Sequence, residues 1–230
     1  IVVALAALEA GIDPEYRAFC RGFTKLGNRQ FHCWKRHGHG HMDIRSALRE
    51  SCDVYFYDIA LKLGVDRISE MAEKMGLGAR FKFELSEEKA GLMPTRAWKR
   101  ATYGQPWHKG ETLIAAIGQG YVLATPLQLA VMTARLVNGG KAVTPQLIVR
   151  PRPIDGDEDI PARPEFASIG VSDIARKTVM DAMDQVVNHP RGTAKKSRIK
   201  DPTMAMGGKT GTSQVRRISM AERDGGVRKN

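Results

Sequence analysis

The chain of 230 residues lacks any apolar run long enough to cross a bilayer. Its most apolar stretch, IVVALAALEAG at residues 1–11, holds about ten apolar residues where about 20 are needed. No basic region precedes this stretch, which excludes a signal peptide, and no initiator Met is present. The stretch has a helical pattern that stops at Gly11, and the chain closes in polar residues at 219–230. We therefore expect an internal piece of a larger protein, truncated at both ends.

Internal repeats and low-complexity tracts are also missing, which excludes solenoids and compositionally biased linkers. The remaining composition, 42% hydrophobic and 27% charged, is that of one large globular domain or two small ones. The net charge of +11 suits an anionic partner, such as nucleic acid, phospholipid head groups or a wall polymer. The densest basic run, RGTAKKSRIK at residues 191–200, has no interleaved aromatics, so we expect no nucleic-acid partner.

Apolar spacing and capping residues predict several helices. They cover residues 1–10, 43–63, 66–76, 125–138 and 171–189. The second is expected to be split near Ser51, Cys52 and Asp53. Thr125 as N-cap with Pro126 in the first turn marks the start of the fourth, and Pro190 the end of the fifth.

The other segments are expected to be extended or irregular. Residues 142–149 (AVTPQLIV) and 204–215 (MAMGGKTGTSQV) have the composition of strands, the second with a glycine-rich start. Residues 12–42 look like an irregular loop rich in Cys and His, and residues 77–111 look loop-rich. Residues 151–164, with four prolines and an acidic run, are interpreted as a surface linker. Helices combined with a late strand indicate an α+β fold.

One candidate chemical motif is Lys209-Thr210-Gly211-Thr212, on the late expected strand. The lysine supplies a positive charge and the two hydroxyls can donate to a carboxylate. Gly211 has no side chain, so a substrate backbone could lie along the strand as an added β-partner. Taken alone, the motif is better interpreted as an ordinary lysine at a strand edge.

A second candidate motif is Ser51-Cys52-Asp53, at the expected helix break. A serine beside a carboxylate at such a position can relay protons. The alternative is structural, because Ser51 or Asp53 could simply cap the helix that follows.

The two motifs together match a known order. An S-x-N type motif followed by K-T-G is found in penicillin-binding proteins and class A β-lactamases. The segments SCDVYFYDIALKLGVDRI, GLMPTRAWK, PWHKGETLIAAIGQGYVLATPLQLA and GKTGTSQV resemble the elongation-type class B penicillin-binding proteins, the penicillin-binding protein 2 family of Gram-negative bacteria. The resemblance covers nearly the whole chain. It implies a central antiparallel sheet with helices on both faces and a mostly helical subdomain.

The resemblance also implies an activity, a peptidoglycan D,D-transpeptidase. In the family, a serine attacks the D-Ala-D-Ala bond of a stem peptide, and the acyl-enzyme then passes to an amine on a neighbouring stem. β-Lactam antibiotics such as penicillins acylate the same serine. The family works at the periplasmic face of the inner membrane, with rod-shape glycosyltransferase and scaffold proteins as partners.

By this resemblance, Ser51 and Asp53 occupy the S-x-N position and are candidate catalytic residues together with Lys209. Asp replaces the usual Asn, and its charge is expected to help hold Lys209 protonated. Thr210 and Gly211 complete K-T-G as substrate-binding residues, and the backbone N–H of Thr212 matches an oxyanion-hole donor.

The family's S-x-x-K tetrad has no plausible counterpart in the chain. The match at residues 197–200 (SRIK) lies in a polar segment nine residues before Lys209 and is rejected. In the family the tetrad opens the helix that resembles IVVALAALEAG, so we expect the nucleophilic serine just before Ile1. The chain alone is then expected to be inactive.

Two rival functions stay open at this point. One is a β-lactam sensor or hydrolase on the same fold. Hydrolysis needs a deacylating base such as a loop glutamate, for which no convincing candidate is found, although Glu84, Glu87 and Glu88 stay open. The other is a non-catalytic, zinc-stabilised remnant, which the missing tetrad favours.

The three cysteines, Cys20, Cys33 and Cys52, form an odd set with two interpretations. In one, Cys20 and Cys33 form a disulfide and Cys52 is a small buried hydrophobe. In the other, all three bind a structural zinc ion together with His39, in a C-x12-C-x5-H-x12-C spacing. We favour zinc, because the loop of residues 12–42 has little apolar content and some members of the resembled family look similar here, although others lack the ligands.

The remaining candidates are expected to be structural. His32, His37 and His41 are alternative metal ligands but are expected to be solvated loop residues. The three tryptophans, Trp34, Trp98 and Trp107, are expected to pack rather than to stack on a ligand.

Overall fold

The computed structural model describes residues 1–81, 87–147, 165–201 and 203–212. Its helices are α1 (Val2–Glu9), α2 (Ile44–Glu50), α3 (Asp53–Leu63), α4 (Val65–Lys74), α5 (Arg96–Tyr103), α6 (Lys109–Ala116), α7 (Pro126–Val137) and α8 (Asp173–Asn188), with a 3₁₀ turn η1 (Lys195–Ser197). Its strands are β1 (Ala18–Cys20), β2 (Phe23–Leu26), β3 (Arg29–His32) and β4 (Gly40–Met42). The expected linker at 151–164 lies outside the described residues.

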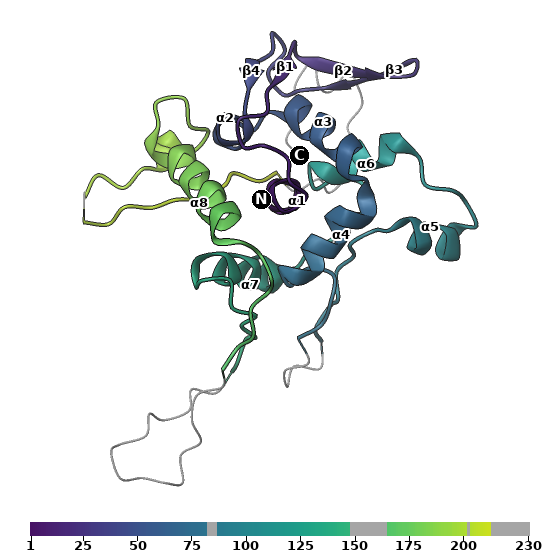
Figure 1. Cartoon of the computed structure of the whole chain (residues 1–230). Helices are drawn as coiled ribbons and strands as arrows, with labels where there is room; N and C mark the ends of the chain where they lie inside the picture. The colour runs from purple at the N-terminus through teal and green to yellow at the C-terminus, as the bar shows by residue number, and fades with distance from the viewer. Residues whose placement is uncertain (82–86, 148–164, 202, 213–230) are drawn as a thin grey trace, which may run out of the picture.

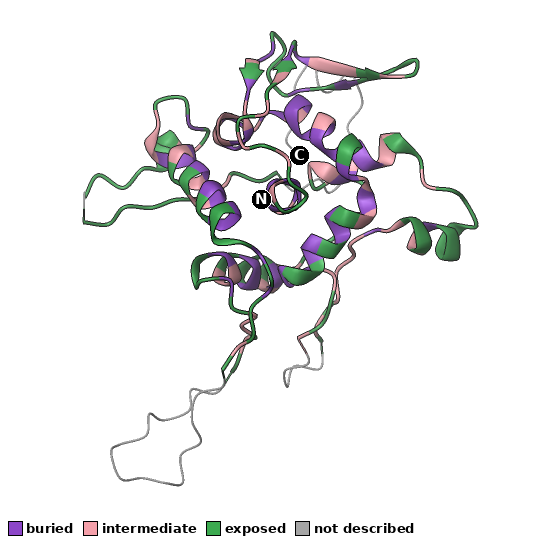
Figure 2. Cartoon of the chain, in the orientation of Figure 1, coloured by how far each residue is buried: buried purple, intermediate pink, exposed green. Residues whose placement is uncertain are grey.

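Helix α1 lies at the centre of the molecule, in contact with α3, α4 and α8 (Figure 1). Residues 3–7 of α1 are all buried, so this short helix is apolar on every side. The surrounding helices turn their buried faces toward it and their exposed faces outward (Figure 2). The apolar opening stretch of the sequence is therefore the core of the fold.

The expected break in the helix of residues 43–63 is confirmed. Helix α2 starts with a capping box, in which the Asp43 carboxylate accepts a 2.8 Å bond from the Ser46 backbone N–H. It ends at Ser51, whose backbone is left-handed at φ 54° and ψ 50°. The backbone N–H of Cys52 then donates to the Ala47 carbonyl at 2.9 Å, and α3 begins at the next residue.

The predicted capping of α7 and the predicted end of α8 are also confirmed. Thr125 accepts a bond from the Gln128 backbone N–H at 3.2 Å, and Pro126 is the first residue of α7. Helix α8 ends two residues before Pro190, which cannot donate the next helical bond.

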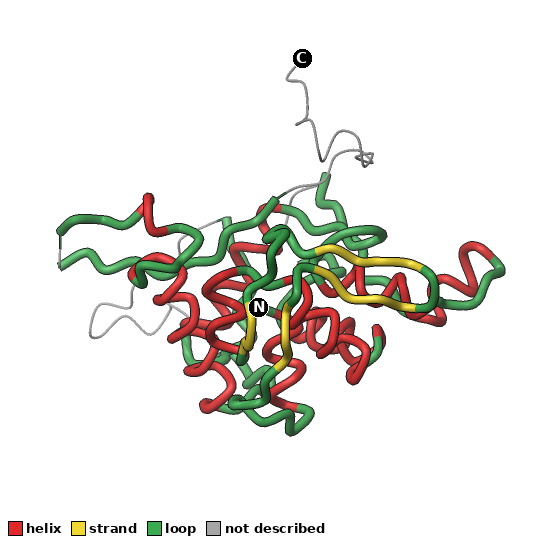
Figure 3. Tube along the Cα trace, turned by 90° about the horizontal axis from the view of Figure 1, so that it is seen from above, coloured by secondary structure: helices red, strands yellow, loops and turns green. Residues whose placement is uncertain are grey.

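Residues 12–42 form two antiparallel ribbons rather than the irregular loop that the sequence suggested. Strand β1 pairs with β4, and β2 pairs with β3 through the turn at Gly27. Seen from above, the β2–β3 hairpin lies on the near side of the helices (Figure 3). Strands of three or four residues are too short to show a clear alternation of apolar and polar positions, so no periodicity marks them in the sequence.

The loop prediction for residues 77–111 is wrong in part, because α5 and the start of α6 lie there. Both helices are short, and their starts are set by local caps. Thr95 accepts from the Trp98 backbone N–H at 2.9 Å, and Glu111 accepts from the His108 backbone N–H at 2.7 Å.

The two predicted extended segments form no strand in their described parts, residues 142–147 and 204–212. A strand needs a hydrogen-bonded neighbour, and the described residues offer only an isolated bridge between Lys141 and Ser168. In the described chain, strands are thus confined to the two ribbons, antiparallel pairing elsewhere is limited to isolated bridges, and no larger central sheet is seen. The predicted α+β fold class is confirmed, because the described chain combines helices with small antiparallel sheets.

The glycines of this ribbon region give a test of the fold. An ideal Cβ on Gly38 (φ 76°) would lie 2.1 Å from the Cys20 carbonyl oxygen, whereas one on Gly27 (φ 60°) would meet nothing within 4 Å. Both positions are left-handed, so alanine costs about 1–2 kcal/mol at either. Because only Gly38→Ala adds a backbone clash, we expect it to lower the Tm of the full-length protein by about 5 °C or more beyond the matched Gly27→Ala control. Equal shifts in a thermal-unfolding comparison would contradict the packing described here.

Candidate active site and metal centre

The two chemical motifs of the sequence meet in the structure. The Lys209 ammonium donates to the Ser51 hydroxyl at 2.5 Å, across a sequence separation of 158 residues. The Thr210 hydroxyl lies 3.4 Å from the Ser51 hydroxyl, and Lys209 also reaches the Thr210 carbonyl oxygen at 3.2 Å. Three of the expected site residues therefore form one polar cluster at the junction of α2 and α3.

Neither Ser51 nor Asp53 caps α3, so the structural alternative for this motif is wrong. The N-cap position is Cys52, which makes no side-chain capping bond. Ser51 is the last residue of the preceding α2 turn, and its hydroxyl faces Lys209. The Asp53 carboxylate accepts a bond from the Trp34 backbone N–H at 2.9 Å.

Burial dominates the electrostatics of Lys209. Burial lowers the pKa of the Lys209 ammonium below its ordinary value, and the charge of Asp53 only partly offsets this. Burial, followed by the charge of nearby Cys33, also raises the pKa of Asp53 to about 7. Asp53 thus favours the protonated lysine, as predicted, but desolvation is the larger effect.

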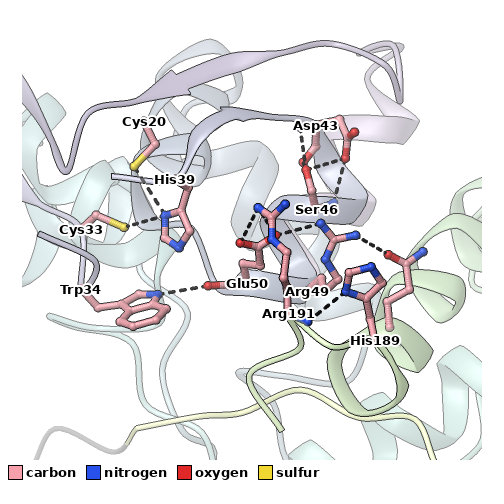
Figure 4. A network of polar contacts seen from close by, with 11 residues as sticks. Cys20, Cys33, Trp34, His39, Asp43, Ser46, Arg49, Glu50, His189 and Arg191 are labelled. Atoms are coloured by element: carbon pink, nitrogen blue, oxygen red, sulfur yellow. Dashed lines mark hydrogen bonds and ion pairs between the residues drawn. The ribbon is translucent and has the colours of Figure 1, made fainter. Parts of the chain in front are cut away.

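Trp34 takes part in the site, although the sequence suggested a packing residue. Its indole N–H donates to two backbone carbonyls, that of Glu50 at 3.1 Å and that of Ser51 at 2.9 Å. The side chain is 60% exposed and lies between the Cys/His cluster and the end of α2 (Figure 4). A tryptophan in a polar loop carries no sequence signal for such a bond, because its acceptors are backbone atoms distant in the sequence.

The rest of the K-T-G segment is open to solvent. Gly211 and Thr212 follow Thr210 in exposed chain, and the residues after Thr212 lie outside the described part. The rejected S-x-x-K at 197–200 starts within η1 and is exposed, as expected for a polar segment.

The three cysteines and His39 form a buried cluster. The ligand atoms of Cys20, Cys33, His39 and Cys52 all lie within 4.8 Å of one another. The Nδ1 atom of His39 is 3.6 Å from the Cys20 sulfur and 3.5 Å from the Cys33 sulfur (Figure 4). A tetrahedral zinc ion with bonds of about 2.0–2.3 Å holds its ligand atoms roughly 3.5–3.8 Å apart, so these residues fit one.

The cysteines are free thiols, and their protonation is strongly coupled. The thiol of Cys52 donates to Cys33, which lowers the pKa of Cys33 to about 3. The same bond, with burial, raises the pKa of Cys52 well above its usual range. Burial also raises the pKa of Cys20. All three sulfurs can be thiolates at once only beside a compensating cation, which a zinc ion in a Cys₃His ligand set would supply.

The other histidines of the loop stay outside the cluster. His32, His37 and His41 are all exposed, and the His41 ring lies against Phe19 at a centroid distance of 5.0 Å. His39 is the histidine that the structure brings to the sulfurs.

Three further residues, Glu50, Arg191 and Thr193, contact the site or its supports, and no sequence motif singled them out. Glu50, which is 4% exposed, is paired with Arg191 at 2.8 Å, and the Thr193 hydroxyl lies 3.0 Å from that of Thr210. These partners are brought together by the fold from the end of α2 and the turn after α8. No local motif could have revealed them.

Comparison with known proteins places this arrangement in a family. Residues 1–222 match the family described as the penicillin binding protein transpeptidase domain. The chain is 38% identical over 218 residues to peptidoglycan D,D-transpeptidase MrdA of Haemophilus influenzae, covering 93% of this chain and 33% of that protein. It is 36% identical over 217 residues to the MrdA protein of Escherichia coli K12, covering 93% of this chain and 34% of that one. The chain thus spans about a third of the length of these curated relatives.

Comparison with solved structures supports the same family. The Pseudomonas aeruginosa PBP2 structure in complex with WCK 5153 superposes with a TM-score of 0.75 at 43% identity, over 85% of this chain and 44% of that one. PBP2 of Helicobacter pylori, solved in complex with MreC, superposes with a TM-score of 0.80 at 32% identity, over 93% of this chain and 38% of that one. The chain belongs to the penicillin-binding protein transpeptidase family, in the branch of MrdA, or penicillin-binding protein 2.

Proposed function

We propose that the protein to which this chain belongs is a serine-type peptidoglycan D,D-transpeptidase that cross-links stem peptides. The observation that carries the proposal is the bond between Lys209 and Ser51, which joins the S-x-D and K-T-G motifs. In this reaction the serine oxygen attacks the carbonyl carbon of the penultimate D-Ala, and the terminal D-Ala leaves with a proton on its amine. An amine of a second stem then attacks the acyl-enzyme and frees the serine.

The described residues have complementary roles in this proposal. Ser51 and Lys209 form a proton path to the leaving amine, because a buried lysine of lowered pKa gives up and regains a proton readily. Asp53 supports the charge of Lys209. Thr210 donates to the substrate carboxylate, and Gly211 leaves room for the substrate backbone. The Thr212 N–H is assigned to the oxyanion of the tetrahedral intermediate, where one donor is commonly worth about 3 kcal/mol.

We assign the nucleophilic serine to an S-x-x-K tetrad just before Ile1. The family resemblance gives this order, and the position of Ile1 supports it. The backbone nitrogen of Ile1 is buried and lies within electrostatic reach of the Lys209 ammonium, so the start of α1 is close to the candidate site.

The proposed setting is the periplasmic face of the bacterial inner membrane, with penicillins as ligands and rod-shape glycosyltransferase and scaffold proteins as partners. The Helicobacter pylori neighbour was solved with MreC, which supports a scaffold partner for this protein. Among the described residues, no helix has the length and apolarity to cross a bilayer. In this proposal, as the family resemblance implies, a membrane anchor belongs to the parent protein outside these 230 residues.

Covalent labelling tests the proposed chemistry. The full-length protein should bind a fluorescent penicillin in a complex that survives denaturation and loses its label slowly. Residues 1–230 alone, and a full-length variant with the tetrad serine changed to Ala, should not be labelled. Rapid turnover of the label would instead support a hydrolase, for which Glu87 and Glu88 are described candidates and Glu84 lies outside the described residues. Labelling of residues 1–230 alone would overturn the assignment of the nucleophile.

Lys209 should show a trade-off between stability and activity. Because the folded state lowers its pKa, the folded protein holds this proton less tightly than the unfolded chain. Stability should therefore rise with pH between the lowered pKa and the ordinary lysine value near 10.4, through which the unfolded chain loses its proton. In full-length protein, Lys209→Met should remove this rise and increase the Tm at neutral pH. It should slow penicillin acylation by about 100-fold or more, the usual contribution of a positioned proton donor.

A matched control for this variant is Lys196→Met, on the exposed turn η1. It should leave both the pH dependence and the acylation rate unchanged. A lower Tm for Lys209→Met at neutral pH would show that the bond to Ser51 outweighs the cost of burying the charge.

We further propose that Cys20, Cys33, His39 and Cys52 hold a structural zinc ion. Zinc would supply the positive charge that lets the three sulfurs coexist as thiolates, and it would close a loop of low apolar content. His39 faces the sulfurs through Nδ1, while its Nε2 atom is buried without a hydrogen-bond partner in the described structure. The role of the site is to fix Cys52, and with it Ser51 and Asp53 on either side.

Metal analysis tests this site independently of activity. Purified full-length protein should contain about one zinc per chain, and a strong chelator should lower its Tm by about 5 °C or more. Cys20→Ser should abolish the zinc content, whereas His37→Ala, at an exposed histidine of the same loop, should leave it unchanged. Near-zero zinc in protein prepared without chelators would rule the proposal out.

A further inference from the structure

The turn that follows α8 is packed tightly against the end of that helix. After His189, the chain folds back so that the Ala194 N–H donates to the Val186 carbonyl at 2.9 Å. Gly192 is buried in this turn, and an ideal Cβ there would lie 2.3 Å from the Val186 carbonyl oxygen and 2.5 Å from that of Gln185. Only glycine fits, so the turn of residues 189–194 has a fixed position on α8.

An ion pair between exposed Arg191 and buried Glu50 ties this turn to the end of α2. The Arg191 guanidinium donates to the Glu50 carboxylate at 2.8 Å, and Arg49 donates to the same carboxylate at 2.8 Å (Figure 4). Arg49 also donates to the Gln185 side chain on α8 at 2.9 Å. A buried carboxylate is costly unless it is fully paired, so Glu50 constrains where Arg191 lies. The two guanidinium groups hold the pKa of Glu50 below its ordinary value, although burial alone would raise it.

The same turn brings a hydroxyl into the candidate active site. The Thr193 backbone N–H donates to the Arg49 carbonyl at 3.2 Å, and its hydroxyl lies 3.0 Å from the Thr210 hydroxyl. Thr210 in turn lies 3.4 Å from the Ser51 hydroxyl, which accepts from Lys209. The result is a continuous polar row that runs from Lys209 through Ser51 and Thr210 to Thr193.

We propose that Glu50 and Arg191 form a positioning pair, which holds the turn so that the Thr193 hydroxyl orients Thr210 toward the substrate carboxylate. A free threonine hydroxyl can rotate and bond to its own surroundings. With Thr193 on one side and Lys209 on the other, the Thr210 hydroxyl is directed to the open face of the site. The inference deepens the proposed transpeptidase function, on which it rests, and the carboxylate is that of the terminal D-Ala or of a penicillin.

The test compares acylation kinetics of full-length variants with a fluorescent penicillin. Arg191→Gln and Thr193→Val should each lower the second-order acylation rate about 10-fold, the effect of one lost hydrogen bond to a charged group. The loss should lie in the dissociation constant of the initial complex rather than in the acylation step, because the groups that move protons are untouched. Thr193→Ser keeps the hydroxyl and should stay within about twofold of the wild type. The Arg191→Gln/Glu50→Gln double variant should be no worse than the single variants, because the two residues act as one unit.

Arg198→Gln is the matched control, since Arg198 is an exposed arginine on the same segment. It should acylate as the wild type does. The inference is overturned if Thr193→Val acylates like this control, if Thr193→Ser is as impaired as Thr193→Val, or if each loss follows a matching loss of Tm. The comparison of Thr193→Val with Thr193→Ser keeps the test decisive even if Arg191→Gln, which removes a partner of buried Glu50, prevents folding. A wild-type protein that takes no label would refute the proposed function, and the inference with it.

Discussion

Ser51 adopts a left-handed backbone conformation, φ 54° and ψ 50°, which costs a residue with a Cβ about 1–2 kcal/mol. No other non-glycine residue in the described chain has a positive φ. Such strain persists only where the surroundings over-determine it. Here the Cys52 N–H closes the end of α2, the Trp34 indole binds the Ser51 carbonyl, and Lys209 binds the hydroxyl. The candidate active site depends on this one residue being held at the junction of two helices.

Two structural supports converge on that junction from opposite sides. On one side, the ribbons of residues 18–42 carry the Cys/His cluster, which includes Cys52, and Trp34, which reaches Glu50 and Ser51. On the other side, the turn after α8 reaches the same helix end through Arg191 (Figure 4). The junction is therefore held by the buried Cys/His cluster on one side and by an ion pair with buried Glu50 on the other.

The helices and the motifs were predictable because their signals are local. The apolar run of α1, the break at residues 51–53 and the capping of α7 by Thr125 follow from spacing and backbone chemistry over a few residues. Elements with weak local signals were missed, because local signals are all that a single sequence offers. The four strands of the Cys/His loop are too short to show a period, α5 and α6 stand in a stretch punctuated by Gly and Pro, and the K-T-G segment has no strand partner in the described chain.

The sequence by itself therefore determined which residues have side chains suited to catalysis, substrate binding or metal binding, namely Ser51, Lys209, Thr210 and the Cys/His set. Only the tertiary structure decided which of them meet, because a contact such as that of Lys209 with Ser51 spans 158 residues and depends on how the helices pack around α1. The tertiary structure also decided the direction of the pKa shift of Lys209, since desolvation of its ammonium exceeds the effect of the Asp53 charge. Burial is a property of the folded surroundings, and no local pattern of residues encodes it.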